Sequence, residues 1–194
     1  MIETRVLTGA ALDGALDDVA RLRIEVFRAF PYLYDGDFAY ERNYLSTYRE
    51  SPCAVLVGAF DGPRLVGAAT GTPLADHAED FAAAFAGRAI DMEKVFYCAE
   101  SVLLPEYRGR GIGHAFFDHR EAHARSHGFA HATFCAVIRP NDHPRRPKDY
   151  TALDDFWSRR GYHPLEGVIA AFSWKDLGDD AETRKPLQFW WRDL

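Results

Sequence analysis

The sequence lacks the features that mark membrane, secreted and repeat proteins. It has no run of about 18 apolar residues, which a membrane-spanning helix needs, and no basic segment followed by an apolar one at its N-terminus. It has only three cysteines, an odd number, so a disulfide framework is not expected. No internal repeat occurs. These absences favour a cytoplasmic protein with reduced thiols, and the length of 194 residues favours one domain over 1–194.

The chain also lacks the positive net charge that is typical of nucleic-acid-binding proteins. It has 23 Lys and Arg against 29 Asp and Glu, a net charge of −6, so we expect no nucleic-acid partner. The charge is uneven, because residues 108–160 contain ten Lys and Arg against six Asp and Glu and so carry +4. A basic centre in an acidic protein suits a polyanionic ligand, although ordinary solvated charge would give the same count.

The most informative stretch runs over residues 95–128. Its first part, V-F-Y-C-A-E-S-V-L-L, is rich in β-branched and aromatic residues and predicts a buried strand that Pro105 ends. The turn R-G-R-G-I-G follows, and then a helix that Gly128 closes. A strand, a glycine-rich turn and a helix N-terminus form an anion site, because free N–H groups converge there at the positive end of the helix dipole.

The glycine spacing distinguishes between kinds of phosphate site. A P-loop would need lysine and a hydroxyl residue after Gly113, and the dinucleotide fingerprint would need glycine where His114 stands. The pattern that fits is R-x-x-G-x-G, formed by Arg108, Gly111 and Gly113. Here the sequence resembles the GNAT superfamily of acetyl-CoA-dependent N-acetyltransferases, whose pyrophosphate loop reads [QR]-x-x-G-x-[GA]. The segment F-W-S-R-R-G-Y over 156–162 is similar to a second pattern of that family.

This resemblance implies a fold and an activity. The fold is of the α/β (α+β) class: a single-domain, mixed, mostly antiparallel sheet of about seven strands, splayed at the central strand and flanked by helices. The expected activity is direct transfer of the acetyl group of acetyl-CoA to a primary amine on a small molecule or a peptide. Two alternatives stay open, namely a non-catalytic acyl-CoA-binding module and a transferase that uses another acyl-CoA.

The resemblance also implies how coenzyme A is bound. The central strand would bind the pantetheine arm through its backbone, the glycine turn would surround the pyrophosphate, and the N–H of Val102 could polarise the thioester carbonyl. The residues expected to bind the cofactor are Ser101, Val102, Leu103, Arg108, Gly109, Arg110, Gly111, Ile112, Gly113, His114 and Asn141.

Glu100 is the candidate general base. It is a carboxylate within an otherwise apolar strand, and burial of a carboxylate costs free energy or raises its pKa unless a partner compensates. Such a group can take a proton from an ammonium, directly or through water. The resemblance supports this role, because many family members carry a glutamate near this position. The alternative is a structural ion pair with an arginine.

The general acid is where the sequence departs from the family. The tyrosine that would protonate the leaving thiolate is replaced by Trp157, whose indole N–H is a donor but not a practical acid. Tyr150, in an insertion that follows Asn141, could supply the hydroxyl, or it is an ordinary loop tyrosine. If neither Trp157 nor Tyr150 acts as the acid, solvent would protonate the thiolate.

The remaining expectations concern the acceptor site and the surface. Aromatic-rich helices over 13–30 and 37–48 would wall the acceptor site, with Tyr34 and Asp35 receiving the amine, or these aromatics are merely half-buried. His119, His123 and His127, interleaved with Arg120, Glu121 and Arg125, read as one solvated helix face, so no metal site is expected. The C-terminal strand around Trp190 would suit the edge of a homodimer.

Overall fold

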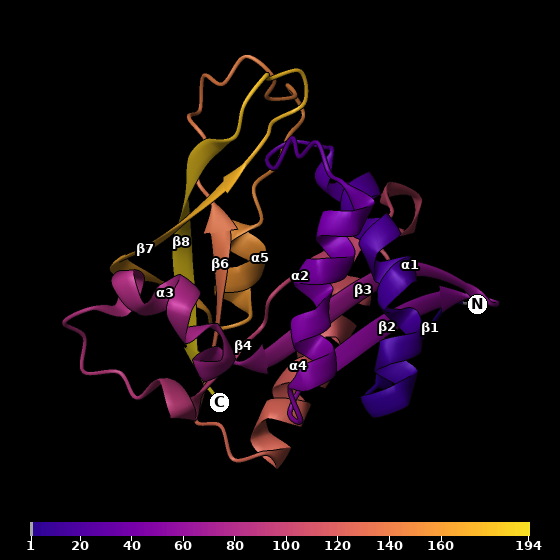
Figure 1. Ribbon diagram of the computed structural model, residues 1–194, viewed down its shortest axis with the longest axis vertical. Helices are drawn as coiled ribbons and strands as arrows, with labels where there is room; N and C mark the ends of the chain where they lie inside the picture. The colour runs from indigo at the N-terminus through magenta and orange to yellow at the C-terminus, as the bar shows by residue number, and fades with distance from the viewer. Residues whose placement is uncertain (1) are drawn as a thin grey trace.

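The computed structural model describes residues 2–194 (Figure 1). Five α-helices, three short 3-10 helices and eight strands make up this part of the chain. Their bounds are β1 Ile2–Leu7, α1 Gly9–Phe27, α2 Phe38–Glu50, β2 Val55–Asp61, β3 Arg64–Pro73, η1 Leu74–His77, α3 Ala78–Phe85, η2 Met92–Lys94, β4 Val95–Tyr97, β5 Ser101–Leu103, η3 Pro105–Tyr107, α4 Ile112–Ser126, β6 His131–Val137, α5 Asp154–Arg159, β7 His163–Trp174 and β8 Thr183–Asp193.

The strands form one open sheet in the order β1-β2-β3-β4-β6-β8-β7, with β5 paired to β3 beside this path. Every pair is antiparallel except β4 with β6. The predicted mixed, mostly antiparallel sheet flanked by helices is therefore confirmed. The strand number is eight rather than about seven, because the single strand expected before Pro105 is divided into β4 and β5.

A bulge causes this division. Tyr97 pairs with Thr72 and Ser101 pairs with Ala69, so residues 98–100 lie opposite only two residues of β3. Before the bulge, β4 runs alongside β6 in the parallel direction, whereas after it β5 pairs only with β3 in the described chain. The sheet therefore splays between β5 and the second half of β6.

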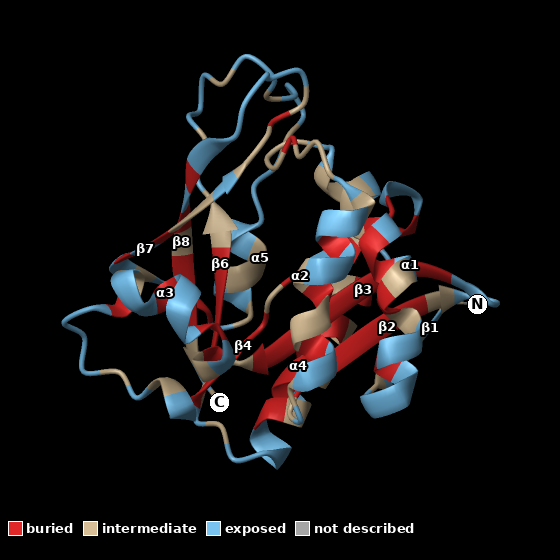
Figure 2. Cartoon of the chain, in the orientation of Figure 1, coloured by how far each residue is buried: buried red, intermediate tan, exposed pale blue. Residues whose placement is uncertain are grey.

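Helices cover the two halves of this splayed sheet. In Figure 1 the helices α1 and α2 lie in front of β2 and β3, α4 lies behind them, and α3 lies beside β7 and β8. Figure 2 shows the central strands as buried and the outer faces of the helices as exposed. The apolar residues of α1 and α4 pack on the β2–β3 half, while Phe81 and Phe85 of α3 pack on the β7–β8 half. Each half thus has an apolar core of its own, and a third cluster, which includes Phe117 of α4, Phe134 of β6 and Trp190 of β8, joins the two.

Some boundaries differ from the sequence prediction. Helix α1 spans Gly9–Phe27 rather than 13–30, so Asp13 lies within it and pairs with Arg49 of α2. Asp37 does cap α2, because its carboxylate accepts a hydrogen bond of 2.9 Å from the N–H of Tyr40. Among residues 2–194, no helix combines the length and the apolar composition that crossing a bilayer requires.

Candidate active site

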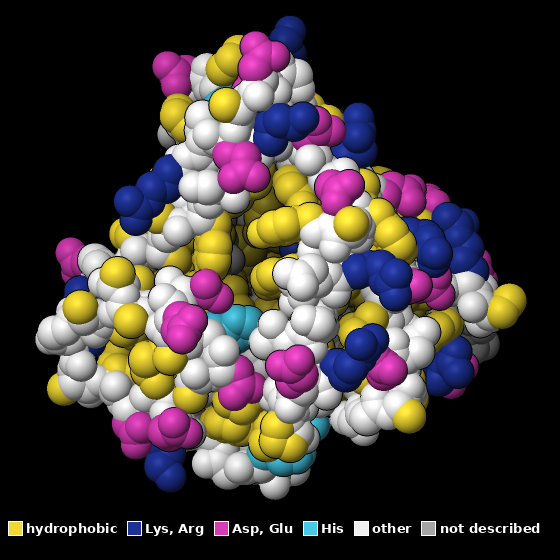
Figure 3. All heavy atoms as spheres, viewed as in Figure 1, with side chains coloured by type: hydrophobic (Ala, Val, Ile, Leu, Met, Phe, Trp, Pro, Cys, Tyr) yellow, Lys and Arg dark blue, Asp and Glu magenta, His cyan; other side chains and the backbone are white. Residues whose placement is uncertain are grey.

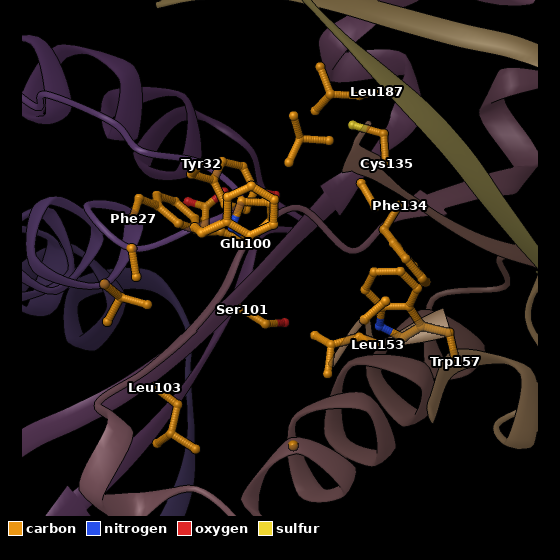
Figure 4. Close-up of a pocket in the computed structure, with 18 of the residues that line it drawn as sticks. Phe27, Tyr32, Glu100, Ser101, Leu103, Phe134, Cys135, Leu153, Trp157 and Leu187 are labelled. Atoms are coloured by element: carbon orange, nitrogen blue, oxygen red, sulfur yellow. The ribbon is translucent and has the colours of Figure 1, made fainter. Parts of the chain in front are cut away.

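A cavity of about 1330 Å³ occupies the splay between β5 and β6. Figure 4 shows Phe27, Tyr32 and Glu100 grouped on one wall, with Phe134, Cys135 and Trp157 on the wall opposite. Figure 3 shows this hollow with hydrophobic side chains inside and acidic side chains around it. The open edges of two strands and the N-terminus of α4 therefore border one cavity.

The glycine turn contributes unpaired N–H groups to this cavity. Gly109 and Gly111 have φ angles of +74° and +79°, which side-chain-bearing residues rarely adopt. In the described chain, the backbone N–H groups of residues 109–113 donate to no acceptor, whereas that of His114 bonds to the carbonyl of Gly111. These free donors precede the first turn of α4, so the turn has the geometry and polarity of an anion site.

Most residues expected to bind the cofactor line the cavity. They are Ser101, Leu103, Arg108, Gly109, Gly111, Ile112, Gly113, His114 and Asn141. Two others do not. The side chain of Val102 is fully buried in the core, and Arg110 lies over the ring of Tyr107 and bonds to the carbonyl of Glu106. Any contact of Val102 with a ligand in the cavity would therefore be through its backbone.

Glu100 ends the bulge and lines the cavity with 5% of its surface exposed. Its Oε2 accepts a hydrogen bond of 3.1 Å from the hydroxyl of Tyr48, which in turn accepts one of 3.0 Å from Thr70. Its Oε1 lies 3.1 Å from Nη1 of Arg23, close enough for an ion pair but not aligned for a hydrogen bond. The arginine partner considered from the sequence is thus present.

Arg23 joins two buried carboxylates, and the sequence did not suggest this. Its guanidinium also bonds to Glu41, which comes from α2 and is fully buried. Burial alone would lower the pKa of Arg23, but the charges of Glu100 and Glu41 outweigh it and hold that pKa above its ordinary value. Arg23 thus bridges a carboxylate of α2 and the carboxylate of Glu100.

Arg120 corrects the prediction of a solvated face on α4. Its side chain is only 1% exposed, and Glu121 is also buried. The Arg120 guanidinium donates to the carbonyls of Thr70 and Glu100 and to the hydroxyl of Ser101. The stripe appeared solvated because its residues are charged, but their partners are distant in the sequence. The acceptors of Arg120 lie on or beside β3 and β5, and Glu121 accepts hydrogen bonds from Arg160, Tyr162 and Arg192.

The histidines of this stripe lie in different surroundings. His123 is half-buried and bonds to the carbonyl of Cys53, and burial lowers its pKa. His119 approaches Thr4, while His127 lies at the end of the helix. Within residues 2–194, no group of three or more His, Cys, Asp and Glu side chains is arranged to hold a metal ion.

Tyr150 lines the cavity from the segment between β6 and α5. Its ring packs edge-on against Phe30, with centroids 4.7 Å apart, and the Arg146 guanidinium lies 4.8 Å from its centroid. Burial raises the pKa of Tyr150, so its hydroxyl stays protonated at neutral pH. The insertion therefore packs onto the loop between α1 and α2.

A cluster around Arg139 ties that loop to the β7–β8 half of the molecule. Arg139 donates to the carbonyls of Pro31 and Tyr32 and makes two hydrogen bonds, of 2.8 and 2.9 Å, to Asp176. Trp174 donates to the same Tyr32 carbonyl. We call Arg139, Asp176 and the two carbonyls the Arg139 clasp. It bridges the two halves at one end of the cavity.

The two residues expected to receive the amine are placed differently. Tyr34 lines the cavity, and burial together with the charge of Glu41 raises its pKa. Asp35 is not among the lining residues; its carboxylate pairs with Lys175 at 2.7 Å. The hydrogen bond from Lys175 lowers the pKa of Asp35.

The sequence and the structure were compared with known proteins. A family model described as the acetyltransferase (GNAT) family matches residues 17–146. No curated protein sequence matches the chain. Similar solved structures include ribosomal-protein-alanine N-acetyltransferase from Brucella melitensis, with a TM-score of 0.62 at 12% identity over 99% of both chains.

Two further similar structures contain a coenzyme. The structure of yncA from Salmonella typhimurium, with its cofactor acetyl-CoA, has a TM-score of 0.61 at 10% identity, covering 100% of this chain and 94% of that one. The PaiA N-acetyltransferase from Thermoplasma acidophilum, in complex with coenzyme A, has a TM-score of 0.55 at 12% identity over 100% and 99%. At these low sequence identities, the similarity shows a shared fold and nothing more.

Proposed function

The chain belongs to the GNAT family of acetyltransferases, and we propose that it transfers the acetyl group of acetyl-CoA directly to a primary amine on a small molecule or peptide. The observation that carries this proposal is one cavity bordered both by the free N–H groups of residues 109–113 and by the buried carboxylate of Glu100. The first feature suits a polyphosphate and the second a proton acceptor.

The cofactor would enter along the glycine turn and β5. The pyrophosphate would accept hydrogen bonds from the turn, and the pantetheine arm would follow the edge of β5 that no strand of the described chain covers. Arg108, His114 and Asn141 line the same part of the cavity and are proposed contacts. Similar structures that hold coenzyme A or acetyl-CoA support this choice of co-substrate.

Glu100 is the proposed general base. As the amine nitrogen bonds to the thioester carbon, Glu100 takes the proton that the nitrogen loses, directly or through a water. The Tyr48 hydroxyl and Arg23 hold the carboxylate in place at the bulge. Direct transfer is favoured over an acyl-cysteine intermediate, because burial raises the pKa of the Cys135 thiol to about 12 and leaves it protonated.

Tyr150 is the proposed source of a proton for the departing thiol. It lines the cavity and keeps its hydroxyl proton at neutral pH. Trp157, at the position where the family resemblance led us to expect a tyrosine, has no acidic proton to give. Replacement of Tyr150 by phenylalanine would therefore lower turnover if the tyrosine acts, and would leave it unchanged if solvent protonates the thiolate.

The acceptor end of the cavity suits an amine on an apolar body. Its walls carry aromatic rings, among them Phe27 and Tyr32 with centroids 4.3 Å apart, and Trp174 beyond them. The Glu100 carboxylate lines this cavity and can attract an ammonium, and aromatic faces also favour cations. Tyr34 is a proposed contact, whereas Asp35 pairs with Lys175 and does not line the cavity.

The experiment is a panel of primary amines incubated with acetyl-CoA, with free thiol measured as the product. Turnover of at least one amine, with saturation in acetyl-CoA, is the expected result. Binding of coenzyme A without turnover on a broad panel would instead favour a non-catalytic acyl-CoA-binding module, which the tryptophan at position 157 would suit. Faster turnover with a longer acyl-CoA would assign a different donor.

A further inference from the structure

Arg120 is a buried cation without a carboxylate partner in the described chain. Its guanidinium is satisfied instead by uncharged acceptors, namely the carbonyls of Phe116, Thr70 and Glu100 and the hydroxyl of Ser101. A buried charge that no opposite charge compensates costs several kcal/mol in general. Arg120 also lines the cavity, so an anion inside the cavity would lie within its field.

Ser101 connects this cation to the cavity. Its Oγ accepts a hydrogen bond of 2.9 Å from Nη2 of Arg120, and in the described chain its own hydrogen is donated to no acceptor. Figure 4 shows the Ser101 hydroxyl pointing across the cavity towards Leu153 and Trp157. A hydroxyl that accepts a bond from a cation is a stronger donor in its turn, because hydrogen bonds in a chain polarise one another.

The opposite wall offers a weaker donor at this place. Leu153 is apolar, and the indole of Trp157 packs on Phe134 and Trp190. The indole N–H can donate a hydrogen bond but has no cation behind it, unlike the Ser101 hydroxyl. Since β5 is also the proposed track of the pantetheine arm, the sulfur of the cofactor would pass beside Ser101.

We propose that the Ser101 hydroxyl, polarised by Arg120, donates a hydrogen bond to the sulfur of coenzyme A and stabilises it as a thiolate. In the transfer, the N–C bond forms, the C–S bond breaks and its electron pair moves onto the sulfur. The proton of the amine goes to Glu100, and Ser101 keeps its own proton while it holds the thiolate, which Tyr150 then protonates as proposed above. Arg120 acts through Ser101 and is a positioning residue. This inference rests on the proposed function.

The test measures the pKa of the coenzyme A thiol bound to the protein, from the ultraviolet absorbance of the thiolate during a pH titration. Wild-type protein is expected to lower this pKa by about one unit, a tenfold preference for the thiolate, as hydrogen bonding to a charged form does. Ser101→Ala is expected to return the pKa to that of free coenzyme A. Ser101→Thr keeps the hydroxyl and is expected to keep the shift.

Further variants separate this role from a structural one. Binding of desulfo-coenzyme A, which has no sulfur to accept the bond, is expected to be equal in wild type and Ser101→Ala. Arg120→Lys keeps a buried cation but loses the forked donor geometry, so the shift in thiol pKa should shrink while the protein stays folded. In enzyme assays, Ser101→Ala is expected to lower kcat about tenfold with little change in KM for the amine.

The outcomes are distinguishable from failure of the proposed function. If wild-type protein does not bind coenzyme A, the proposed function fails and this inference with it. If coenzyme A binds but its thiol pKa is the same in wild type and Ser101→Ala, only the role of Ser101 is overturned. Loss of the shift in Trp157→Phe, with retention in Ser101→Ala, would assign the bond to the indole instead.

Discussion

The two walls of the cavity are built in different ways. The wall of β3, β5 and α4 is defined by backbone: a bulge, two glycines with positive φ, and the carbonyls that Arg120 holds. The wall of β6, α5 and the segment 138–153 is defined by side chains, with stacked aromatic rings and the Arg139 clasp. The first wall suits the constant part of the reaction, the cofactor. The second wall, together with the α1–α2 loop that the clasp holds against it, suits the variable part, the acceptor.

This difference also explains where each wall tolerates change. A backbone-defined site depends on a few residues whose φ angles or hydrogen bonds cannot be replaced. A site defined by side chains can be reshaped by substitution and insertion, as loops on a rigid scaffold commonly are. Variants on the first wall should therefore alter cofactor binding or chemistry, and variants on the second should alter acceptor binding and stability.

The largest effect is expected at the Arg139 clasp. Arg139→Met would remove the hydrogen bonds to Asp176 and to the loop carbonyls, and loss of one partner of a buried ion pair costs about 3 kcal/mol of unfolding free energy. Urea unfolding measures this loss. The KM of the acceptor should also rise, while the Kd of coenzyme A should not. Arg145→Met, at an exposed pair with Asp179, is the control, and an equal loss there would contradict the role of the clasp.

The next effect concerns the chemistry on the first wall. Glu100→Gln should lower kcat about 100-fold, because the amide cannot take a proton from the amine. The Kd of coenzyme A should stay within about twofold of wild type, since the glycine turn is unchanged. Steady-state kinetics and calorimetry measure the two quantities. Glu106→Gln, on an exposed position of η3, is the matched control, and an unchanged kcat in Glu100→Gln would remove this residue from the mechanism.

A smaller effect is expected from the glycine turn. Gly111→Ala places a side chain at φ +79°, which costs roughly 1–2 kcal/mol although no atom lies within 4 Å of the new Cβ. The expected result is coenzyme A binding weakened by about tenfold with the acceptor KM unchanged. Gly113→Ala, where φ is ordinary and the nearest atom lies at 3.6 Å, should bind nearly as wild type. Equal losses in both variants would show that crowding matters rather than conformation.

The smallest effect is a dependence of stability on pH at the second wall. Burial raises the pKa of Asp176, but hydrogen bonds from Arg139 and Lys185 outweigh it and hold that pKa below its ordinary value of 3.8. As the pH falls, the unfolded chain therefore binds a proton at Asp176 before the folded chain does. The stabilisation of the folded state by ionised Asp176 is complete above about pH 4 and is lost in more acidic solution. The stability difference between wild type and Asp176→Asn should shrink below about pH 4 in urea titrations. A difference in unfolding free energy that does not change with pH would contradict this prediction.

Local signals in the sequence predicted the first wall well. Pro105 and the glycines fix the end of the strand and the start of α4 regardless of what packs against them. The bulge was not predicted, because it depends on distant pairing: β4 pairs with both β3 and β6, whereas β5 pairs with β3 alone. The roles of Arg23 and Arg120 were also missed, since a charged residue on a helix gives no sign of acceptors that lie on distant strands.

The second wall could hardly be predicted at all. The clasp joins Arg139 to Pro31 and Asp176, residues far apart in the chain, and nothing in their local sequences indicates the contact. The aromatic content of the helices suggested a wall near the acceptor, but not which rings would enter the cavity. The functional identity of the chain thus came from the part with local signals.

The bulge between β4 and β5 has one more consequence. Because β5 pairs only with β3, and the last four residues of β6 have no strand on the side facing it, the described sheet contains a gap between these two strands. The pantetheine arm of the cofactor would complete this sheet much as a guest strand does in β-augmentation. Saturating coenzyme A should then add a link between the two halves of the sheet, beside β4, the clasp and the hydrogen bonds that Glu121 accepts from Arg160 and Arg192. It should also slow the amide exchange of both bordering strands.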